Sequence, residues 1–242
     1  MQGYIEFDEG NGRGILSQRR ILGGTFLTLQ LGCGGMFARR RAARAAREMR
    51  RQGVRTAVFP LDFPLTAVLE RQGITPIDPL PLRRAMCARL VRQRLEKLGY
   101  APTQAVVAVV GDYLSHEMEQ TVKTLALHYR YVMLSVPSGA EELARSLRRE
   151  YGVSLLLKPS CDQLERADAL LLFAPRPDLR GENTVLCALY PGGETGRGRV
   201  AVCLSDEAAV SLPPNCCQEQ LAAALYSMGA VDERILHGEI FC

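Results

Sequence analysis

Short apolar runs alternate along this chain with segments in which apolar residues recur at helical spacing. Unbroken or nearly unbroken apolar runs are typical of strands that are buried on both faces of a parallel sheet. The clearest of them cover residues 25–31, 54–59, 106–110 and 131–136. The intervening segments repeat apolar residues every three or four positions, as amphipathic helices do. This alternation predicts an α/β fold.

In the first half, Gly53 and Gly73 each follow a helical pattern, where glycine favours a left-handed helix end. The expected helices cover about 36–52, a segment ending at Gly73, and 81–98. The expected strands cover 4–7, 25–31, 54–59 and 74–77. Residues 1–24 combine a Gly- and Asn-rich turn with a basic segment, which predicts an edge hairpin or a mobile arm.

In the second half, Ser115 is the predicted N-cap of a helix whose apolar stripe recurs at helical spacing. The stripe consists of Met118, Val122, Leu125 and Tyr129. Ser138 and Glu141 have the spacing of a capping box. The expected strands cover 106–110, 131–136, 153–157 and 169–173, and a helix and a strand are expected near 218–228 and 235–241. Residues 184–190 and 199–204 are expected to pair as an antiparallel hairpin.

Together these elements predict two consecutive Rossmann-like three-layer units with mainly parallel sheets, followed by a C-terminal β-hairpin and helix. The connection at 99–102 is the expected boundary, which separates a basic α/β domain with an N-terminal arm (1–100) from a Rossmann-like domain (101–242). The first part holds 18 Lys or Arg against 8 Asp or Glu, and the second holds 12 against 18. Such asymmetry is typical of an anion-binding face or of two parts that attract each other.

Composition limits the class of protein. Hydrophobic residues make up 47% and charged residues 23%, which is ordinary for a globular chain. No run approaches the roughly 18 apolar residues of a membrane span, and no cleavable signal is expected, so the sequence predicts a cytoplasmic protein without membrane contact. The eight cysteines form no Cys-x-x-Cys pair and are expected to be reduced, mostly buried thiols.

The junction at Gly32, Gly34 and Gly35 is the first candidate for a ligand site. Glycines before a helix allow a phosphate to approach free backbone N–H groups, and Arg39 and Arg40 would add positive charge. However, Phe37 stands where the dinucleotide fingerprint has its third glycine, so the fingerprint is incomplete and no cofactor is assigned. Asp62 follows the next predicted strand, 27 residues after Gly35, whereas a ribose-binding acid follows at about 20. A turn or cap role for Asp62 therefore stays open.

The second candidate is the strand–helix junction that holds Asp112, Ser115 and His116. Open α/β sheets bind ligands beyond the carboxyl ends of their strands, and this junction lies at such an end. His116-Glu117 lacks the second histidine of a zinc-protease motif, and no metal site is expected. First-turn residues on an exposed helix end are the alternative interpretation. Vicinal Cys216-Cys217 is interpreted as part of a turn before a helix.

Seven arginines lie within residues 39–51, opposite an alanine-rich face, and they are expected to form a solvated surface. Nucleic-acid binding is not expected, since tryptophan is absent and no helix-turn-helix or aromatic platform occurs. No Gly-x-Ser-x-Gly elbow and no Walker loop occur either.

The order of elements resembles that of two-domain proteins such as shikimate dehydrogenases and glutamyl-tRNA reductases, although no motif of either family occurs. The sequence favours a binding protein or enzyme for an anionic or phosphate-bearing small molecule, with the ligand between the two halves. The alternative is a non-catalytic interaction or scaffold module with a degenerate Rossmann-like fold. Neither the reaction nor the oligomeric state follows from the residues.

Overall fold

A computed structural model describes residues 1–242 except 11–13, 194–196, 211, 213–214 and 242. The chain forms two compact units, which are described separately. The first consists of residues 1–79 and 203–237, and the second of residues 80–202 and 238–242. Helix α3 (Leu80–Lys97), which the sequence places in the N-terminal half, packs on helix α4 of the second unit. The predicted division at residue 100 into separately stable domains stays a prediction.

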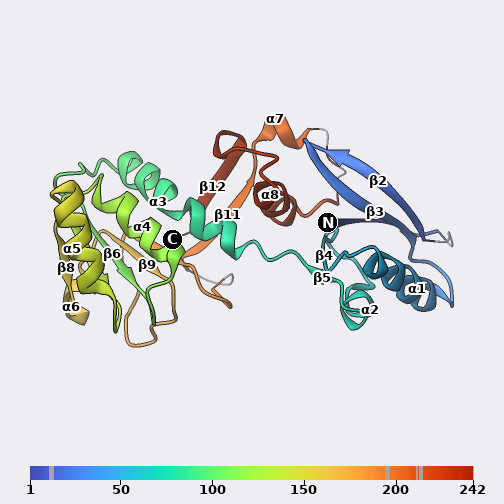
Figure 1. The fold of residues 1–242 in the computed structure, drawn as a ribbon, viewed down its shortest axis with the longest axis horizontal. Helices are drawn as coiled ribbons and strands as arrows, with labels where there is room; N and C mark the ends of the chain where they lie inside the picture. The colour runs from blue at the N-terminus through green and yellow to red at the C-terminus, as the bar shows by residue number, and fades with distance from the viewer. Residues whose placement is uncertain (11–13, 194–196, 211, 213–214, 242) are drawn as a thin grey trace. The chain divides into compact units, whose positions relative to one another are not determined.

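The first unit contains a five-stranded sheet in the order β2-β3-β1-β4-β5 (Figure 1). Its strands are β1 (Gln2–Asp8), β2 (Ile15–Ile21), β3 (Gly24–Gly32), β4 (Thr56–Val58) and β5 (Thr75–Pro76). All neighbours pair in parallel except β2, which is antiparallel to β3 at the edge. The expected edge hairpin is therefore β2 with β3. The prediction that residues 4–7 belong to an edge hairpin or arm is wrong, since β1 lies in the middle of the sheet.

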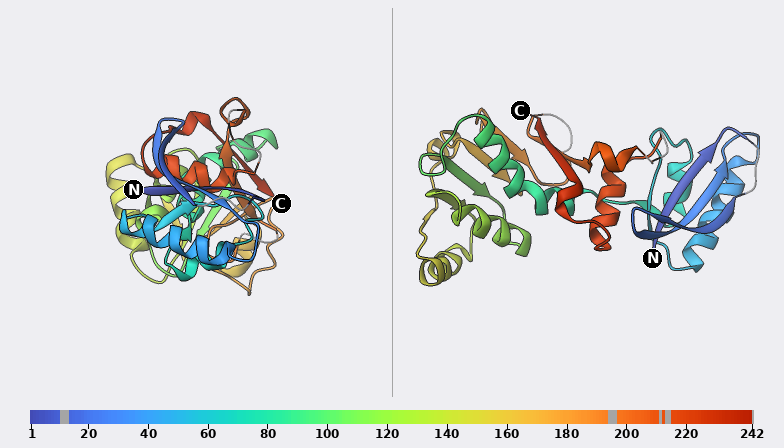
Figure 2. Two further views of the ribbon diagram at one scale, coloured as in Figure 1. Left: turned by 90° about the vertical axis from the view of Figure 1, so that its right-hand side faces the viewer. Right: turned by 90° about the horizontal axis from the view of Figure 1, so that it is seen from above.

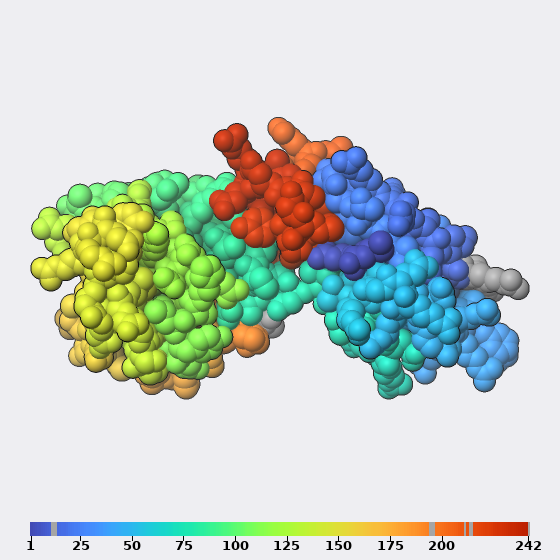
Figure 3. Space-filling view, viewed as in Figure 1, coloured from blue at the N-terminus to red at the C-terminus, as the bar shows by residue number. Residues whose placement is uncertain are grey.

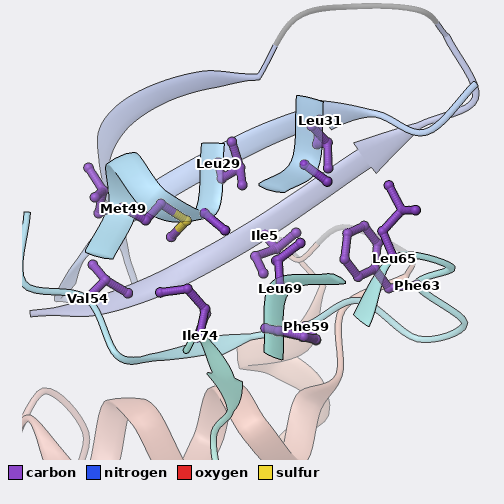
Figure 4. Packing of buried hydrophobic residues seen from close by; sticks show 14 of the residues in the cluster. Ile5, Leu29, Leu31, Met49, Val54, Phe59, Phe63, Leu65, Leu69 and Ile74 are labelled. Atoms are coloured by element: carbon purple, nitrogen blue, oxygen red, sulfur yellow. The ribbon is translucent and has the colours of Figure 1, made fainter. Parts of the chain in front are cut away.

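Helices cover both faces of this sheet. Helices α1 (Ala38–Arg51) and α2 (Thr66–Arg71) pack on one face, where Ile5, Leu29 and Met49 belong to one buried cluster (Figure 4). On the other face, the hydrogen bond from Gln2 Nε2 to Ser227 Oγ joins β1 to helix α8 (Gln218–Ser227). The space-filling view accordingly shows the dark-blue start of β1 beside the red α8 (Figure 3). The predicted three-layer arrangement is confirmed here.

Helix α1 forms as its pattern predicts. Its buried residues are Ala38, Ala42, Ala46 and Met49, which face the sheet. Alanine at the contact allows the helix to approach the strands closely, while the arginines lie on the remaining surface. No helix among the described residues is long and apolar enough to cross a membrane.

The second unit contains a parallel sheet in the order β10-β9-β6-β7-β8. Its strands are β6 (Val106–Val110), β7 (Tyr131–Ser135), β8 (Leu155–Leu157), β9 (Ala169–Leu172) and β10 (Val185–Ala188). Because β6 is flanked by β7 on one side and β9 on the other, the order is that of a Rossmann half, with a reversal between β6 and β9. The Rossmann-like prediction is confirmed by this strand order.

Helix α3 packs together with α4 (His116–Ala126), and α5 (Ala140–Tyr151) packs on β8 (Figure 2). The apolar stripe predicted for α4 is buried, with Met118 and Val122 fully inaccessible. A separate core includes Ala108, Leu164 and Leu170, so the short helix α6 (Cys161–Glu165) packs against the strands too. Tyr151, expected to be buried, is 43% exposed because it is the last residue of α5.

Two local predictions are wrong. The capping box at Ser138 and Glu141 does not form, because the N-cap of α5 is Gly139 at a left-handed φ of 85°, a conformation that favours glycine. The box occurs instead at Ser160 and Gln163, before α6.

The hairpin predicted from 184–190 and 199–204 does not form either, because β10 pairs in parallel with β9. Strand β11 (Arg199–Leu204) instead forms a two-stranded sheet with β12 (Leu236–Phe241). Hydrogen bonds from Gly198 N to Phe241 O and from Ser205 N to Ile235 O show that this C-terminal pair is antiparallel. The short helices α7 (Asp206–Ala209) and η1 (Glu233–Ile235) lie between its strands in sequence, together with α8.

Candidate functional site

The glycine loop of the first unit connects β3 to α1. Cys33 N donates to Asp8 O at 2.8 Å and Gly34 N donates to Gly10 O at 3.0 Å, so these two N–H groups are already paired. Gly35 has a left-handed φ of 78°. The loop therefore makes the sharp turn that glycine permits, but it offers a ligand fewer free donors than its sequence implies.

Arg41 holds this loop from the helix. Its Nη2 donates to Gly34 O at 2.6 Å and to Gly32 O at 3.2 Å. Its Nε is buried and has no hydrogen-bond partner among the described residues. A guanidinium N–H in this situation needs an acceptor, since an unpaired buried donor costs about 1–3 kcal/mol.

Arg39 and Arg40, the arginines that the sequence singled out, are exposed at the start of α1. The guanidinium of Arg40 lies 5.7 Å from the centroid of the Phe37 ring. Asp62 is exposed after β4 and has a left-handed φ of 57°, which fits the turn role that the sequence left open. The structure thus places Gly32, Gly34 and Gly35 beside the N-terminus of α1.

A groove of about 800 Å³ runs along α1, facing the start of β2. Its described lining consists of Gly14, Leu16, Arg41, Arg44, Ala45, Arg47, Glu48 and Arg51. We call it the arginine groove. Four of these residues are arginines, and Glu48 is the single carboxylate among those described, paired with Arg51 at 3.2 Å. The groove is therefore strongly positive.

Sequence reasoning did not single out this arrangement, although one signal for it exists. Arg41, Arg44, Arg47 and Arg51 are spaced three or four residues apart, so they form one stripe on α1. The neighbouring Arg39 and Arg40 do not line the groove. Which arginines share a surface with β2 depends on the sheet edge, which the helix pattern does not contain.

The residues predicted in the second unit lie at the carboxyl edge of its sheet. Ser115 is the N-cap of α4, and its hydroxyl accepts from Met118 N at 3.2 Å. Asp112 and His116 are exposed on either side of it. These three residues belong to a different compact unit from the glycine loop. The prediction that one ligand contacts both sets stays a prediction.

Arg84 of α3 holds the same edge together. Its Nε donates to Leu189 O after β10 at 2.9 Å, and its Nη1 lies 3.0 Å from Glu117 Oε2 in the first turn of α4. The guanidinium also lies 5.5 Å from the centroid of the Phe173 ring, after β9. One side chain, 17% exposed, therefore connects a helix start with two strand ends.

We expect Arg84→Ala to lower the free energy of unfolding by about 2–3 kcal/mol, because charged hydrogen bonds to partly buried partners contribute more than exposed pairs. Arg92→Ala is the matched control on the same helix. Its ion pair with Glu96 is about half exposed on both sides, so the loss should stay below about 0.5 kcal/mol. Urea denaturation followed by circular dichroism measures both values. Equal losses in the two variants would show that Arg84 does not hold this edge.

Groups of three or more His, Cys, Asp or Glu that could hold a metal ion are absent from the part of the chain that the structure describes. The seven described cysteines are free thiols. Cys87 is fully buried, and burial raises the pKa of its thiol to about 12. It is therefore a neutral core residue.

No protein-family model matches this chain, and no curated protein matches it in sequence. Among solved structures, D-lactate dehydrogenase with NAD+ from Lactobacillus jensenii is 11% identical over 60% of this chain and 48% of that chain, with a TM-score of 0.28. The chain thus spans about half the length of that enzyme.

Dipicolinate synthase from Bacillus halodurans is 10% identical over 77% of this chain and 70% of that chain, with a TM-score of 0.38. Ornithine carbamoyltransferase from Pyrococcus furiosus is 15% identical over 85% and 74%, with a TM-score of 0.30. None of these likenesses identifies a function.

Proposed function

We propose that the protein binds a small anionic, phosphate-bearing molecule in the arginine groove. The observation that carries this proposal is the groove itself, in which four arginines and one already paired glutamate line a single space of about 800 Å³. Ligand pockets commonly measure about 300–1,000 Å³, so the space suits a molecule of nucleotide or sugar-phosphate size.

The chemistry of the lining favours phosphate over other acids. A guanidinium offers planar, forked N–H donors that match two phosphate oxygens, and several of them share the charge of a dianion. Arg44 lies exposed, and Arg47 uses only its Nε, which donates to Ala43 O at 3.2 Å. Arg41 adds the buried, unpaired Nε next to the glycine loop. No catalytic step is part of this proposal.

Isothermal titration with pyrophosphate and with ATP tests the proposal. We expect Arg44→Gln/Arg47→Gln to weaken binding at least about tenfold, since each lost charge-assisted hydrogen bond contributes about 1.5–3 kcal/mol at most and less on an exposed surface. Arg39→Gln/Arg40→Gln removes the same charge from the same helix, outside the groove, and should change the affinity less than about threefold.

Equal losses in the two double variants would overturn the groove as the site and would restore the first turn of α1 as the better candidate. Affinity should fall as salt rises, because the contacts are electrostatic. A single-stranded or duplex oligonucleotide that binds far more tightly than ATP through the same arginines would replace the small molecule with nucleic acid.

The alternative function, a non-catalytic interaction module, has one specific observation in its favour. Met36 is 89% exposed and Phe37 is 52% exposed, side by side before α1. Neighbouring exposed apolar side chains are common at protein contacts, although two residues make a small patch. Failure of every anionic probe to bind would leave this alternative as the better one.

A further inference from the structure

A second pocket of the first unit, of about 350 Å³, lies on the opposite side of the sheet's middle from the arginine helix. It lies where β1 loses one of its two neighbours. β1 pairs with β3 as far as Asp8 and Gly32, but with β4 only as far as Tyr4 and Val58. Beyond Tyr4, the β4-facing side of β1 therefore has no strand pairing.

The chain after β4 turns away from β1 toward the segment before α8. Phe59 N donates to Gln220 Oε1 at 2.8 Å, and Leu61 N donates to Asn215 O at 2.8 Å. Pro60 and Cys216 form an isolated bridge. The pocket occupies the resulting opening, with Val58 and Pro60 on one side and Asn215 and Cys216 on another.

This position follows from the strand order. From β1 the chain goes by way of β2 to β3 on one side of β1, and α1 then returns it to β4 on the other side. Such a reversal leaves a crevice beyond the carboxyl ends of the two central strands, where open α/β sheets bind ligands. The pocket is thus at the topological switch point of this sheet.

Two side chains of β1 face the pocket. Side chains alternate along a strand, so Tyr4 and Glu6 lie on this face, whereas Ile5 packs in the cluster beneath α1. The Glu6 carboxylate pairs with Arg19 and accepts from Gln30 Nε2 at 3.1 Å, so its charge is balanced while lone pairs remain.

Tyr4 and Cys216 are hydrogen-bonded to each other and carry no charge near neutral pH. Burial raises the pKa of the Tyr4 phenol far above its usual range, and burial also raises the pKa of the Cys216 thiol. The thiol is therefore no nucleophile here. It serves as a soft, apolar wall of the pocket.

We propose that this pocket binds a small, uncharged, planar molecule that carries a hydrogen-bond donor beside an acceptor, of the carboxamide or heterocyclic-amide class. The unpaired edge of β1 offers backbone N–H and C=O groups, Glu6 accepts a donor, and Val58 and Pro60 contact an apolar ring. An anion meets the Glu6 carboxylate, and a cation finds that carboxylate already neutralised by Arg19.

Three probes of equal shape separate these charges: benzamide, benzoate and benzylamine. Saturation-transfer NMR detects their binding, and titration of the protein's amide resonances gives the affinities. We expect benzamide to bind at least about tenfold more tightly than benzoate, with benzylamine no tighter than benzamide. Absence of benzamide binding, or benzoate binding as tightly as benzamide, would overturn the proposal.

Asn215→Trp places an indole at the exposed rim of the pocket and should abolish benzamide binding. Glu70→Trp is the matched control at an exposed position of α2, and it should leave binding unchanged. Thermal unfolding shows whether both variants fold. Unchanged benzamide binding in folded Asn215→Trp would contradict the assignment.

Glu6→Gln gives an independent readout, since it removes the carboxylate but keeps its shape. It should bring the benzoate affinity to within about threefold of the benzamide affinity. Persistence of the full discrimination would contradict the role of Glu6. The Arg44→Gln/Arg47→Gln variant should bind benzamide as the wild type does, so this proposal and that of the arginine groove fail separately.

Discussion

Asn183→Asp is expected to lower the free energy of unfolding by about 3–5 kcal/mol, because each buried carbonyl that loses its donor costs about 1–3 kcal/mol. Asn183 is 2% exposed, and its amide donates to Leu164 O and Ala167 O at 2.8 Å each, and to Glu165 O at 3.3 Å. It thereby satisfies the end of α6 beside β9. Aspartate keeps the shape but places oxygens against these carbonyls.

The loss should depend on pH. Burial raises the pKa of a carboxyl above its value in the unfolded chain, so protonated Asp is favoured in the folded state. The stability difference from the wild type should then be smallest below the unfolded pKa and grow as pH rises through the folded pKa. Urea denaturation at pH 4 and pH 8 measures it, and hydrogen exchange localises it to the second unit.

Asn183→Leu serves as the comparison, since it also removes the donors but introduces no titratable group. It should be destabilised without this pH dependence. Asn215→Asp is the exposed control and should change stability by less than about 0.5 kcal/mol. A loss below about 1 kcal/mol in Asn183→Asp at pH 8 would contradict the role of these three bonds.

Met49→Ala is expected to lower the free energy of unfolding by about 2–5 kcal/mol, as deletions of fully buried Met or Leu side chains do. Met49 is inaccessible in the cluster between α1 and the sheet, close to Val54 and Leu29 in the close-up (Figure 4). Met36→Ala, at a position that is 89% exposed, is the matched control. Equal effects would show that α1 is not anchored by Met49.

Gly3 provides a test of the same contact from the strand side. A Cβ at Gly3 would lie 2.7 Å from Met49 Cε, so Gly3→Ala should destabilise the wild type by crowding this methyl group. In the Met49→Ala background the added methyl group has more room, and its cost should fall by about 1 kcal/mol. An equal cost in both backgrounds would mean that other neighbours, such as Ala57, determine the crowding.

Local patterns were sufficient for most helices and strands but not for their partners. The strand and helix positions were found because burial leaves a period of two or 3.6 residues in the sequence itself. The partner of β10 was predicted wrongly, because a hairpin rule considers only the next strand in sequence, whereas a parallel neighbour such as β9 is reached through a different connection. The cap of α5 was misassigned, since Ser138 has the right spacing while Gly139 has the conformation that the turn requires.

The candidate sites divide in the same way. The glycine loop was visible because its residues are adjacent, and so was the α4 N-cap at Ser115. The arginine groove needs Leu16 of β2 beside Arg44 of α1, and the second pocket needs Tyr4, Val58 and Cys216 together. No periodicity connects residues so far apart in sequence.

By itself the sequence determined the α/β class, the alanine and arginine faces of α1, the buried stripe of α4 and the absence of a complete dinucleotide fingerprint, since each depends on residues within one or two turns of chain. The tertiary structure alone decided that β1 lies in the middle of its sheet. It also decided that β4 ends beside Tyr4 and opens a pocket there. Strand order is set by packing of whole faces against each other, so the crevice at a reversal appears only after every strand has found its neighbour.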